Sequence, residues 1–294
     1  MLKILKTRKT AMVAAIFLVI IILVGIFADF VAPYDVNENH VPDRYTKPFK
    51  QTAVLDENGQ ETGKMEIKYL LGTDEFGRDV FSQMCYGARM TLICALGVVV
   101  LSLVTGTVFG LIAGYFKTAG ALIMRFIDAM MAFPPIMLAM VLVVALGQSA
   151  FCVIVAVGTY FMTRMTRIVY GLTLSLKEQT YIEAAKSQGV NNSRIVARHI
   201  FPNLLSPIIV QATFTFSSSI LQMASLDYLG LGVSSEHPTW GGLLNAGKSV
   251  MMIAPWMVIV PGIIIVLTVL SLNVIGDVMR DNSDPKFRDI LKEG

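Results

Sequence analysis

The chain has 294 residues, of which 54% are hydrophobic and 15% are charged, and its mean hydropathy is +0.64. This balance is far from that of a water-soluble domain and is typical of an integral membrane protein. The formal net charge of +3 is spread along the chain without a basic stripe or an aromatic stacking platform. We therefore expect membrane lipid, and no nucleic acid, as the surroundings of this chain.

The first charge-free apolar run extends from Ala11 to Ala28, after a basic start. Because crossing a hydrocarbon core of roughly 30 Å takes about 20 helical residues, the run predicts a first transmembrane helix. The same pattern resembles a signal peptide. However, the apolar run exceeds the usual length of about 7 to 15 residues and no small-x-small cleavage site follows. We favour an uncleaved anchor.

Residues 32–87 are rich in Pro, Asn, Asp and Glu, which predicts a small segment outside the membrane. In its middle, QTAVLDENGQETGKMEIKYL has the turn residues DENG between two short β-compatible runs, so we expect a hairpin there. The stretch LGTDEFGRD lacks the alternating acids of a calcium loop, and the three histidines of the chain are far apart. We therefore expect no metal site.

The second apolar run extends from Met90 to Phe116 and contains glycines at intervals of four residues. Residues with this spacing share one face of a helix, and small residues on such a face let another helix approach closely. We predict helix packing along Gly106, Gly110 and Gly114.

The third apolar run, Ala129 to Thr163, contains 35 residues. As one helix it would be about 52 Å long, too long for a single crossing. The sequence LGQS near its middle favours a break, and we divide the run at Gly147 to Ser149. Together with runs at Ile200 to Leu226 and Ser249 to Gly276, this predicts six transmembrane helices. Pro261 predicts a kink in the last one.

A polar stretch, KEQTYIEAAKSQGVNNSRIVARHIFPN, occupies residues 177–203 between apolar runs. Its first part, Leu174 to Gln188, is rich in helix-forming residues. Four of them lie at positions i, i+3, i+4 and i+7 and so share one mostly small face. These four are Tyr181, Ala184, Ala185 and Gln188.

Gly189 lies where a helix would end in a left-handed cap. The NNS that follows offers N-cap residues for a second short helix, which we expect to end before Pro202. The prediction is a helix-turn-helix elbow. A solvated connector is the alternative, but it would need only a few residues. We favour docking onto a partner, through the small face and the adjacent Glu183.

The positions of Lys and Arg predict the orientation of the chain. With the N-terminus inside, 16 of the 24 basic residues fall on the inner side. Because positive residues are retained on the cytoplasmic side, we expect both termini and the elbow to be cytoplasmic.

The elbow resembles the EAA loop of ATP-binding-cassette importer permeases, in which Glu-Ala-Ala is followed by Gly and then by a hydrophobic-Pro pair. The matching residues are Glu183, Ala184, Ala185, Gly189, Ile200 and Pro202. Further stretches resemble the second permease subunit of dipeptide, oligopeptide and nickel importers, and the resemblance covers nearly the whole chain apart from residues 40–68. These stretches are LGTDEFGRDVFSQMCYGARMTL, MRFIDAMMAFPPIMLAM, LDYLGLGV, PTWGGLLNAG and APWMVIVPGIIIVLTVLSLNVIGDVMRDNSDPK.

The resemblance implies an all-α integral membrane protein with the MetI-like permease fold of type I importers, located in the bacterial cytoplasmic (inner) membrane. The implied organisation has four parts. They are a cytoplasmic N-terminus and first helix at 1–31, an extracytoplasmic segment at 32–87, a five-helix core at 88–280 with the EAA loop at 171–203, and a cytoplasmic tail at 281–294.

The resemblance also implies partners. They are a second homologous permease subunit that forms a heterodimer, two ATP-binding subunits and an extracytoplasmic solute-binding protein. The chain itself would be non-catalytic and would bind no cofactor, because ATP and Mg would be used by the partner ATPases. The coupling helix would dock through Tyr181, Glu183, Ala184, Ala185, Gln188 and Gly189, with support from Arg194, Ile200 and Pro202.

The expected substrates are dipeptides or oligopeptides, with nickel or a metal chelate as the alternative. Where many relatives have LAEAALS this chain has LQMASLD, so Met223 and Asp227 replace a Glu and a Ser. Because an ionisable group near a membrane pathway is costly to bury, both positions are candidates for lining that pathway. Alternatively, Asp227 is a solvated residue at the membrane interface.

Two other classes are less well supported. Neither Gly-x-Ser-x-Gly nor a phosphate-binding Gly-Lys-Ser/Thr loop occurs, so nothing indicates an enzyme. A self-sufficient secondary transporter would be expected to have repeated halves and paired ionisable groups at mid-membrane. We find no such repeat, and this class stays a distant alternative.

Overall fold

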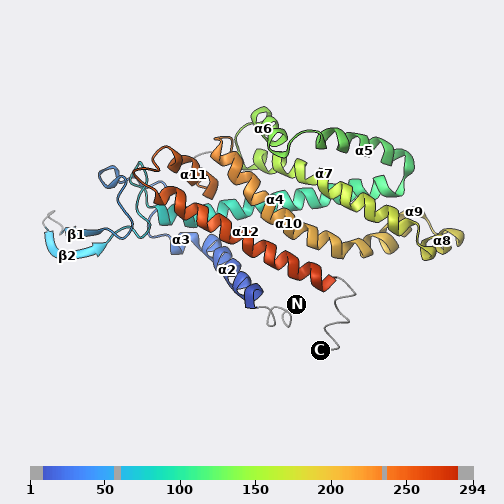
Figure 1. Ribbon diagram of the computed structural model, residues 1–294, viewed down its shortest axis with the longest axis horizontal. Coiled ribbons are helices and arrows are strands. Elements are labelled where there is room, and N and C mark those ends of the chain that lie inside the picture. Colours follow the sequence, from blue (N-terminus) through green and yellow to red (C-terminus); the bar gives the residue numbers. More distant parts are fainter. Residues whose placement is uncertain (1–8, 56–60, 234–236, 284–294) are drawn as a thin grey trace. The chain divides into compact units, whose positions relative to one another are not determined.

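The computed structural model describes residues 9–55, 61–233 and 237–283, and these residues are mainly helical (Figure 1). The chain forms two compact units. Unit 1 comprises the described parts of Met1–Leu18, Cys94–Met223 and Val269–Gly294, and unit 2 those of Val19–Ile93 and Ala224–Thr268. The predicted all-α membrane architecture is confirmed.

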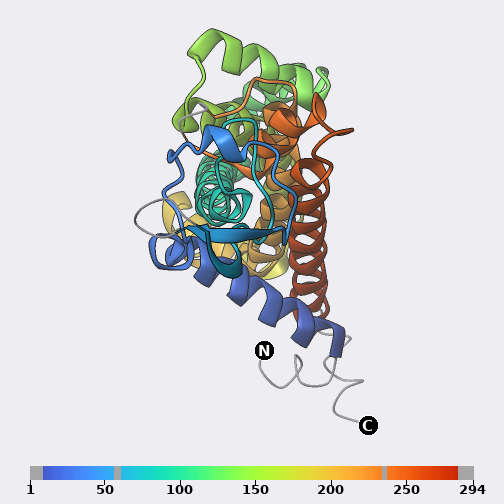
Figure 2. The same ribbon diagram turned by 90° about the vertical axis from the view of Figure 1, so that its left-hand side faces the viewer.

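Among the described residues, five helical segments are long and apolar enough to cross a membrane. They are α2 (Lys9–Ile26), α4 (Val80–Tyr115), α7 (Ala150–Lys177), the segment Asn192–Tyr228 that includes α10 (Phe201–Tyr228), and α12 (Trp256–Ser283). Figure 2 shows α12 as one uninterrupted helix, which includes Pro261. The kink at this proline stays a prediction.

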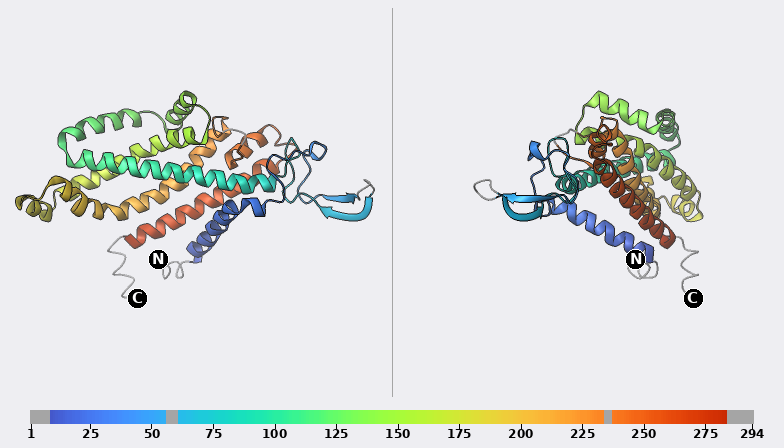
Figure 3. Two further views of the ribbon diagram at one scale, coloured as in Figure 1. Left: turned by 180° about the vertical axis from the view of Figure 1, so that it is seen from behind. Right: turned by 60° about the vertical axis from the view of Figure 1, so that its left-hand side comes forward.

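The predicted third span is a bent pair of helices. Helices α5 (Lys117–Met131) and α6 (Pro135–Leu146) are bent by 94° relative to each other. Figure 3 shows the two helices on either side of this bend. Two consecutive prolines cause the break, because Pro134 and Pro135 have no N–H to donate to a continuing helix. Pro135 instead occupies the first turn of α6, where no such donor is needed. If the pair forms one span, the described residues contain six candidate crossings.

The predicted division of the long apolar run is confirmed. Helix α6 ends at Leu146, and Gly147 has a φ of +100°, which favours glycine. Ser149 then begins α7, because its Oγ accepts a hydrogen bond from the Cys152 N–H at 3.2 Å.

Within unit 1, the glycine face of α4 contacts α7. A Cβ atom added at Gly106, Gly110 or Gly114 would lie 2.6, 2.5 and 2.6 Å from the Cβ atoms of α7 residues. These distances are too short for any side chain, so glycine permits the close approach of the two helices. The facing residues are Met165, Val169 and Thr173.

Unit 2 contains the predicted hairpin. Strands β1 (Gln51–Leu55) and β2 (Glu61–Ile67) pair antiparallel, with Gln51 opposite Ile67. The predicted DENG turn lies outside the described residues. Two short helices precede the hairpin, α3 (Ala28–Val31) and the 3-10 turn η1 (Val41–Asp43).

Unit 2 also contains a helix that the sequence did not reveal, α11 (Trp240–Lys248). Its Thr239 cap accepts a hydrogen bond from the Gly242 N–H at 2.9 Å. The Trp240 side chain is 1% exposed and donates its indole N–H to the Met84 carbonyl at 3.2 Å. This bond attaches α11 to the first turns of α4.

The stretch LGTDEFGRD forms a turn that leads into α4. Asp74 is 2% exposed, and its carboxylate accepts hydrogen bonds from the N–H groups of Phe76 and Arg78, the Arg78 side chain and Gln83. Asp79 caps α4 by accepting bonds from the Ser82 N–H and hydroxyl, both at 2.8 Å. Burial raises the pKa of Asp79 despite these bonds.

Candidate functional site

The predicted elbow lies in unit 1 and is defined here as residues 178–200. It contains α8 (Thr180–Ser187), α9 (Asn192–Ile195) and a π-helical turn, η2 (Val196–Ile200). Figure 1 shows α8 and α9 at the ends of α7 and α10. The elbow is therefore carried by two of the long helices.

The first helix of the elbow is shorter than predicted. Leu174 to Lys177 form the last turn of α7, and Glu178 and Gln179 separate that turn from α8. The cap of α8 is confirmed, because Gly189 has a φ of +77°. The Val190 N–H donates back to the Ala185 carbonyl at 3.1 Å, as in a Schellman cap.

The second helix does not end before Pro202, contrary to the prediction. The predicted N-cap is present, since the Asn191 side chain accepts from the Ser193 N–H at 3.4 Å. The helix then widens into the π-helical turn, in which the Phe201 N–H reaches the Val196 carbonyl, and continues as α10. Because proline is tolerated in the first turn of a helix, Pro202 lies in the first turn of α10 and does not terminate α9.

An apolar cluster fixes the elbow to the long helices. Ile182 of α8 and Ile195 of α9 are both 0% exposed. They pack with residues from α4, α7, η2 and α10. Burying one such side chain stabilises a protein by about 1.5 to 3 kcal/mol, so the elbow is held as part of unit 1. The other members are Tyr115, Met165, Val169, Ile200, Leu204 and Ile208.

Polar contacts add to this attachment at the end of α4. The Tyr115 hydroxyl donates to the Asn192 side chain at 2.6 Å. The Lys177 ammonium group donates to the Tyr115 carbonyl at 2.5 Å, which satisfies a carbonyl in the last turn of α4. The beginning of α9 and the end of α7 are thus both tied to the same residue.

The predicted docking face divides between two sides of α8. Tyr181, Glu183, Ala184 and Gln188 are exposed, whereas Ala185 is half-buried and packs against the apolar cluster. Gly189 is also exposed, and no atom lies within 4 Å of the position that its Cβ would occupy. The accessible part of the predicted docking face therefore consists of an aromatic ring, a carboxylate, a methyl group, a side-chain amide and the bare backbone of Gly189.

The predicted supporting residues have different environments. Ile200 is buried in the apolar cluster, whereas Arg194 and Pro202 are exposed. Sequence reasoning missed Ile182, Ile195, Tyr115 and Asn192. The signal for the first two was present, because each is a large aliphatic residue within a mainly polar stretch.

Met223 and Asp227 of α10 are both buried, at 3% and 6% exposure. The Asp227 carboxylate accepts hydrogen bonds from the Thr239 hydroxyl at 2.7 Å and from the Val233 N–H at 3.1 Å. The backbone of Gly241 is so close that an added Cβ would lie 2.6 Å from this carboxylate. Asp227 therefore holds the end of α10 to the beginning of α11 within unit 2.

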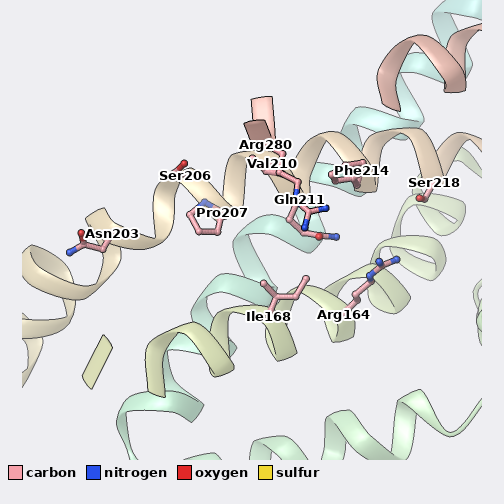
Figure 4. Close-up of a pocket in the computed structure, with 10 residues that line it drawn as sticks. All are labelled: Arg164, Ile168, Asn203, Ser206, Pro207, Val210, Gln211, Phe214, Ser218 and Arg280. Atoms are coloured by element: carbon pink, nitrogen blue, oxygen red, sulfur yellow. The ribbon is translucent and has the colours of Figure 1, made fainter. Parts of the chain in front are cut away.

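Unit 1 contains a cavity of about 750 Å³ between α7, α10 and α12 (Figure 4). Figure 4 shows Gln211 extending from α10 toward α7, which contributes Arg164 and Ile168. Six of the ten lining residues are polar. The lining residues are Arg164, Ile168, Asn203, Ser206, Pro207, Val210, Gln211, Phe214, Ser218 and Arg280.

Comparison with known proteins gives two family matches. Residues 106–289 match the family described as the binding-protein-dependent transport system inner membrane component. Residues 1–48 match the N-terminal transmembrane domain of oligopeptide transport permease C.

Relatives are similar along almost their whole length. A dipeptide transport system permease protein of Alkalihalophilus pseudofirmus is 39% identical over 97% of this chain and 88% of its own length. A di/tripeptide transport system permease protein of Pseudomonas aeruginosa is 36% identical, over 96% and 90%. A glutathione transport system permease protein of Pectobacterium atrosepticum is 38% identical, over 96% and 88%.

Proposed function

This chain belongs to the family of binding-protein-dependent transport system inner membrane components, and we propose that it imports dipeptides or oligopeptides as one permease subunit of an ATP-driven transporter. It is a multi-pass membrane permease of the type I fold. The support for a peptide substrate is that the three relatives described above are named for dipeptide, di/tripeptide and glutathione transport.

In the proposed machine, a second homologous permease subunit completes the pathway and two ATP-binding subunits dock onto the permeases. An extracytoplasmic binding protein delivers the peptide. ATP and Mg are used by the ATP-binding subunits, and this chain binds neither. The elbow and both termini face the cytoplasm of a bacterial cell, an orientation supported by the excess of basic residues on that side.

The elbow transmits the movement of the ATP-binding subunits. A displacement of α8 can reach the membrane only if α8 moves together with the long helices, because a loosely attached loop would absorb it. Ile182 and Ile195 supply this attachment through the apolar cluster that they share with α4, α7 and α10. This burial, beneath an exposed polar face, is the single observation that carries the proposal.

The proposed docking is tested by copurification of the ATP-binding subunits with variants of the elbow. Gly189→Asp adds a charge to the exposed cap, whereas Gly189→Asn has nearly the same shape, is neutral, and tolerates the left-handed backbone equally well. We expect Gly189→Asp to release the ATP-binding subunits and to abolish uptake, and Gly189→Asn to retain both. Glu183→Lys is expected to act like Gly189→Asp, with Glu183→Gln as its matched neutral control.

Membrane insertion of each variant is checked by its yield and by its elution as a monodisperse species. Normal copurification of the ATP-binding subunits with both charged variants would contradict the docking role of α8. Equal loss with the charged and the neutral variants would instead point to a general disturbance of the elbow.

A further inference from the structure

The cavity of unit 1 is lined by two exposed arginines. Neither Arg164 of α7 nor Arg280 of α12 forms an ion pair within the described part of the chain. By contrast, Arg167, three residues further along α7, pairs with Asp128. The cavity therefore carries positive charge that the described chain does not neutralise.

Such charge is costly in a membrane helix and is a functional candidate by default. Arg164 is exposed and directly follows the apolar run that ends at Thr163, 14 residues or about 21 Å along α7. A guanidinium group presents a planar fork of donors that matches a carboxylate in a bidentate geometry. The cavity is therefore suited to a small anion, and a carboxylate is one group that fits the fork.

The rest of the lining fits the other parts of a peptide. Asn203, Gln211 and Ser218 offer donors and acceptors for amide groups, and Phe214 offers an apolar surface. Pro207 has no N–H, so it cannot donate the usual helical bond to the Asn203 carbonyl one turn earlier. The volume of about 750 Å³ is in the range of small-ligand sites, roughly 300 to 1,000 Å³.

We propose that Arg164 and Arg280 bind the terminal carboxylate of the transported peptide in this cavity. The inference rests on the proposed function, since the peptide is its substrate. The carboxylate is common to peptides whatever their side chains, so the site accepts many sequences. The lining residues of α10, from 203 to 218, begin directly after the elbow, which places the site on the side from which the peptide leaves.

Two other anions could meet these arginines. A phospholipid headgroup would bring acyl chains that need a long apolar surface, whereas six of the ten lining residues are polar. A carboxylate of the second permease subunit would form a structural ion pair, and its loss would weaken assembly. The experiment below distinguishes both from a peptide.

The test measures binding of two probes, alanylalanine and its C-terminal amide, to the assembled importer. The complex is placed in nanodiscs without the binding protein, whose own selectivity would interfere, and binding is followed by saturation-transfer NMR. We expect the wild type to prefer the acid over the amide. Arg164→Gln and Arg280→Gln should each weaken binding of the acid about tenfold, as for the loss of one charge-assisted hydrogen bond, with little change for the amide.

Arg125→Gln is the matched control. Arg125 is an exposed arginine of α5, it has no carboxylate partner in the described ranges, and it is not among the lining residues. Its substitution should leave the affinities for both probes unchanged. Arg164→Lys, which keeps the charge but loses the fork, should retain part of the preference.

Three outcomes would overturn the site: no preference of the wild type for the acid, unchanged acid binding by both glutamine variants, or loss of subunit assembly in them. A lipid control replaces phosphatidylglycerol by phosphatidylcholine in the nanodiscs of the wild-type complex. If this exchange alone weakens binding of both probes equally and as much as the glutamine variants do, the arginines bind a lipid headgroup, and the proposed peptide site is overturned. ATP-dependent peptide uptake by the complete wild-type system is measured in parallel. If uptake is normal, only this inference fails. If no peptide is imported, the proposed function fails.

Discussion

The two units differ in how they surround their ionisable side chains. The residues compared are Asp74 and Asp227 in unit 2, and Arg164 and Arg280 in unit 1. Asp74 accepts four hydrogen bonds and Asp227 accepts two, all from neighbouring groups of the chain. The two arginines line a cavity, and neither has a carboxylate partner in the described residues. The carboxylates hold the fold together, whereas the arginines remain available to an anion.

This contrast distinguishes two roles of an ionisable residue near a membrane, a structural role and a binding role. A charge that is fully hydrogen-bonded by its own chain stabilises the fold, and its removal leaves buried donors unpaired. A charge that faces a cavity contributes little to the fold, and its removal changes binding. Four substitutions or conditions test the contrast.

The largest effect is expected for Asp74→Ala. The substitution leaves the Arg78 and Gln83 side chains and two backbone N–H groups without their acceptor, at a site that is 2% exposed. Breaking a buried charged pair costs about 3 to 5 kcal/mol of unfolding free energy. Thermal unfolding in detergent should therefore show a large fall in Tm or no folded protein. Glu75→Ala, at the adjacent exposed position, is the control and should unfold like the wild type.

Asp227→Asn is expected to have a smaller effect. The Val233 N–H and the Thr239 hydroxyl donate to different oxygens of Asp227, and asparagine replaces one of these oxygens by an NH2 group, which then faces one of the two donors. The cost should be about 1 to 3 kcal/mol, measured as a lower Tm. The ratio of uptake rates among peptides should not change. Altered substrate preference at normal stability would instead place Asp227 in the pathway.

The sequence predicted the elements whose signals are local. Gly147 and Gly189 marked two helix boundaries, and each has a positive φ. The turn residues DENG between two β-compatible runs predicted the hairpin strands. The bend before α6 was not predicted, because Pro134 and Pro135 lie within an unbroken apolar run. In this case two missing N–H groups outweigh hydropathy.

The contents of the candidate sites were less predictable. The predicted small face of α8 is divided, because Ala185 packs inward with Ile182 against an apolar cluster whose other residues come from distant helices. The partners of Asp227 likewise come from a loop and from α11, which had no recognisable signal. The cavity depends on how α7, α10 and α12 converge, and no local pattern encodes that.

The third test concerns the partly exposed ion pair of Asp43 and Lys68. The Tyr69 hydroxyl donates a hydrogen bond to the same Asp43 oxygen. Burial raises the pKa of Asp43, but hydrogen bonds from Lys68 and Tyr69 outweigh it and hold the pKa below its ordinary value. A carboxylate whose pKa is lowered by folding stabilises the fold at pH values above its ordinary, unfolded-state pKa. This stabilisation is lost as the pH falls through the pKa of the folded state. At pH values below about 4, the Tm of the wild type should therefore decrease slightly more than the Tm of Asp43→Asn. The corresponding difference in the free energy of unfolding should be no more than about 1 kcal/mol. Identical acid profiles would show that the pair contributes nothing.

The smallest effect on stability is expected for Arg164→Gln and Arg280→Gln. Because neither arginine pairs with a carboxylate of the described chain, their loss should change the free energy of unfolding by no more than about 0.5 kcal/mol. The measurement is Tm of the purified permease, compared with Arg125→Gln. A large fall in Tm for either variant would mean that its charge is structural, like that of Asp74, and the contrast between the units would disappear.

The most direct test of the proposed function is peptide uptake into proteoliposomes. This chain is reconstituted alone with an ion gradient and, in parallel, with the second permease, the ATP-binding subunits, the binding protein and ATP. We predict uptake of dipeptides only by the complete system and only with ATP. Robust uptake by the chain alone, driven by the ion gradient, would contradict the assignment and indicate a self-sufficient secondary transporter.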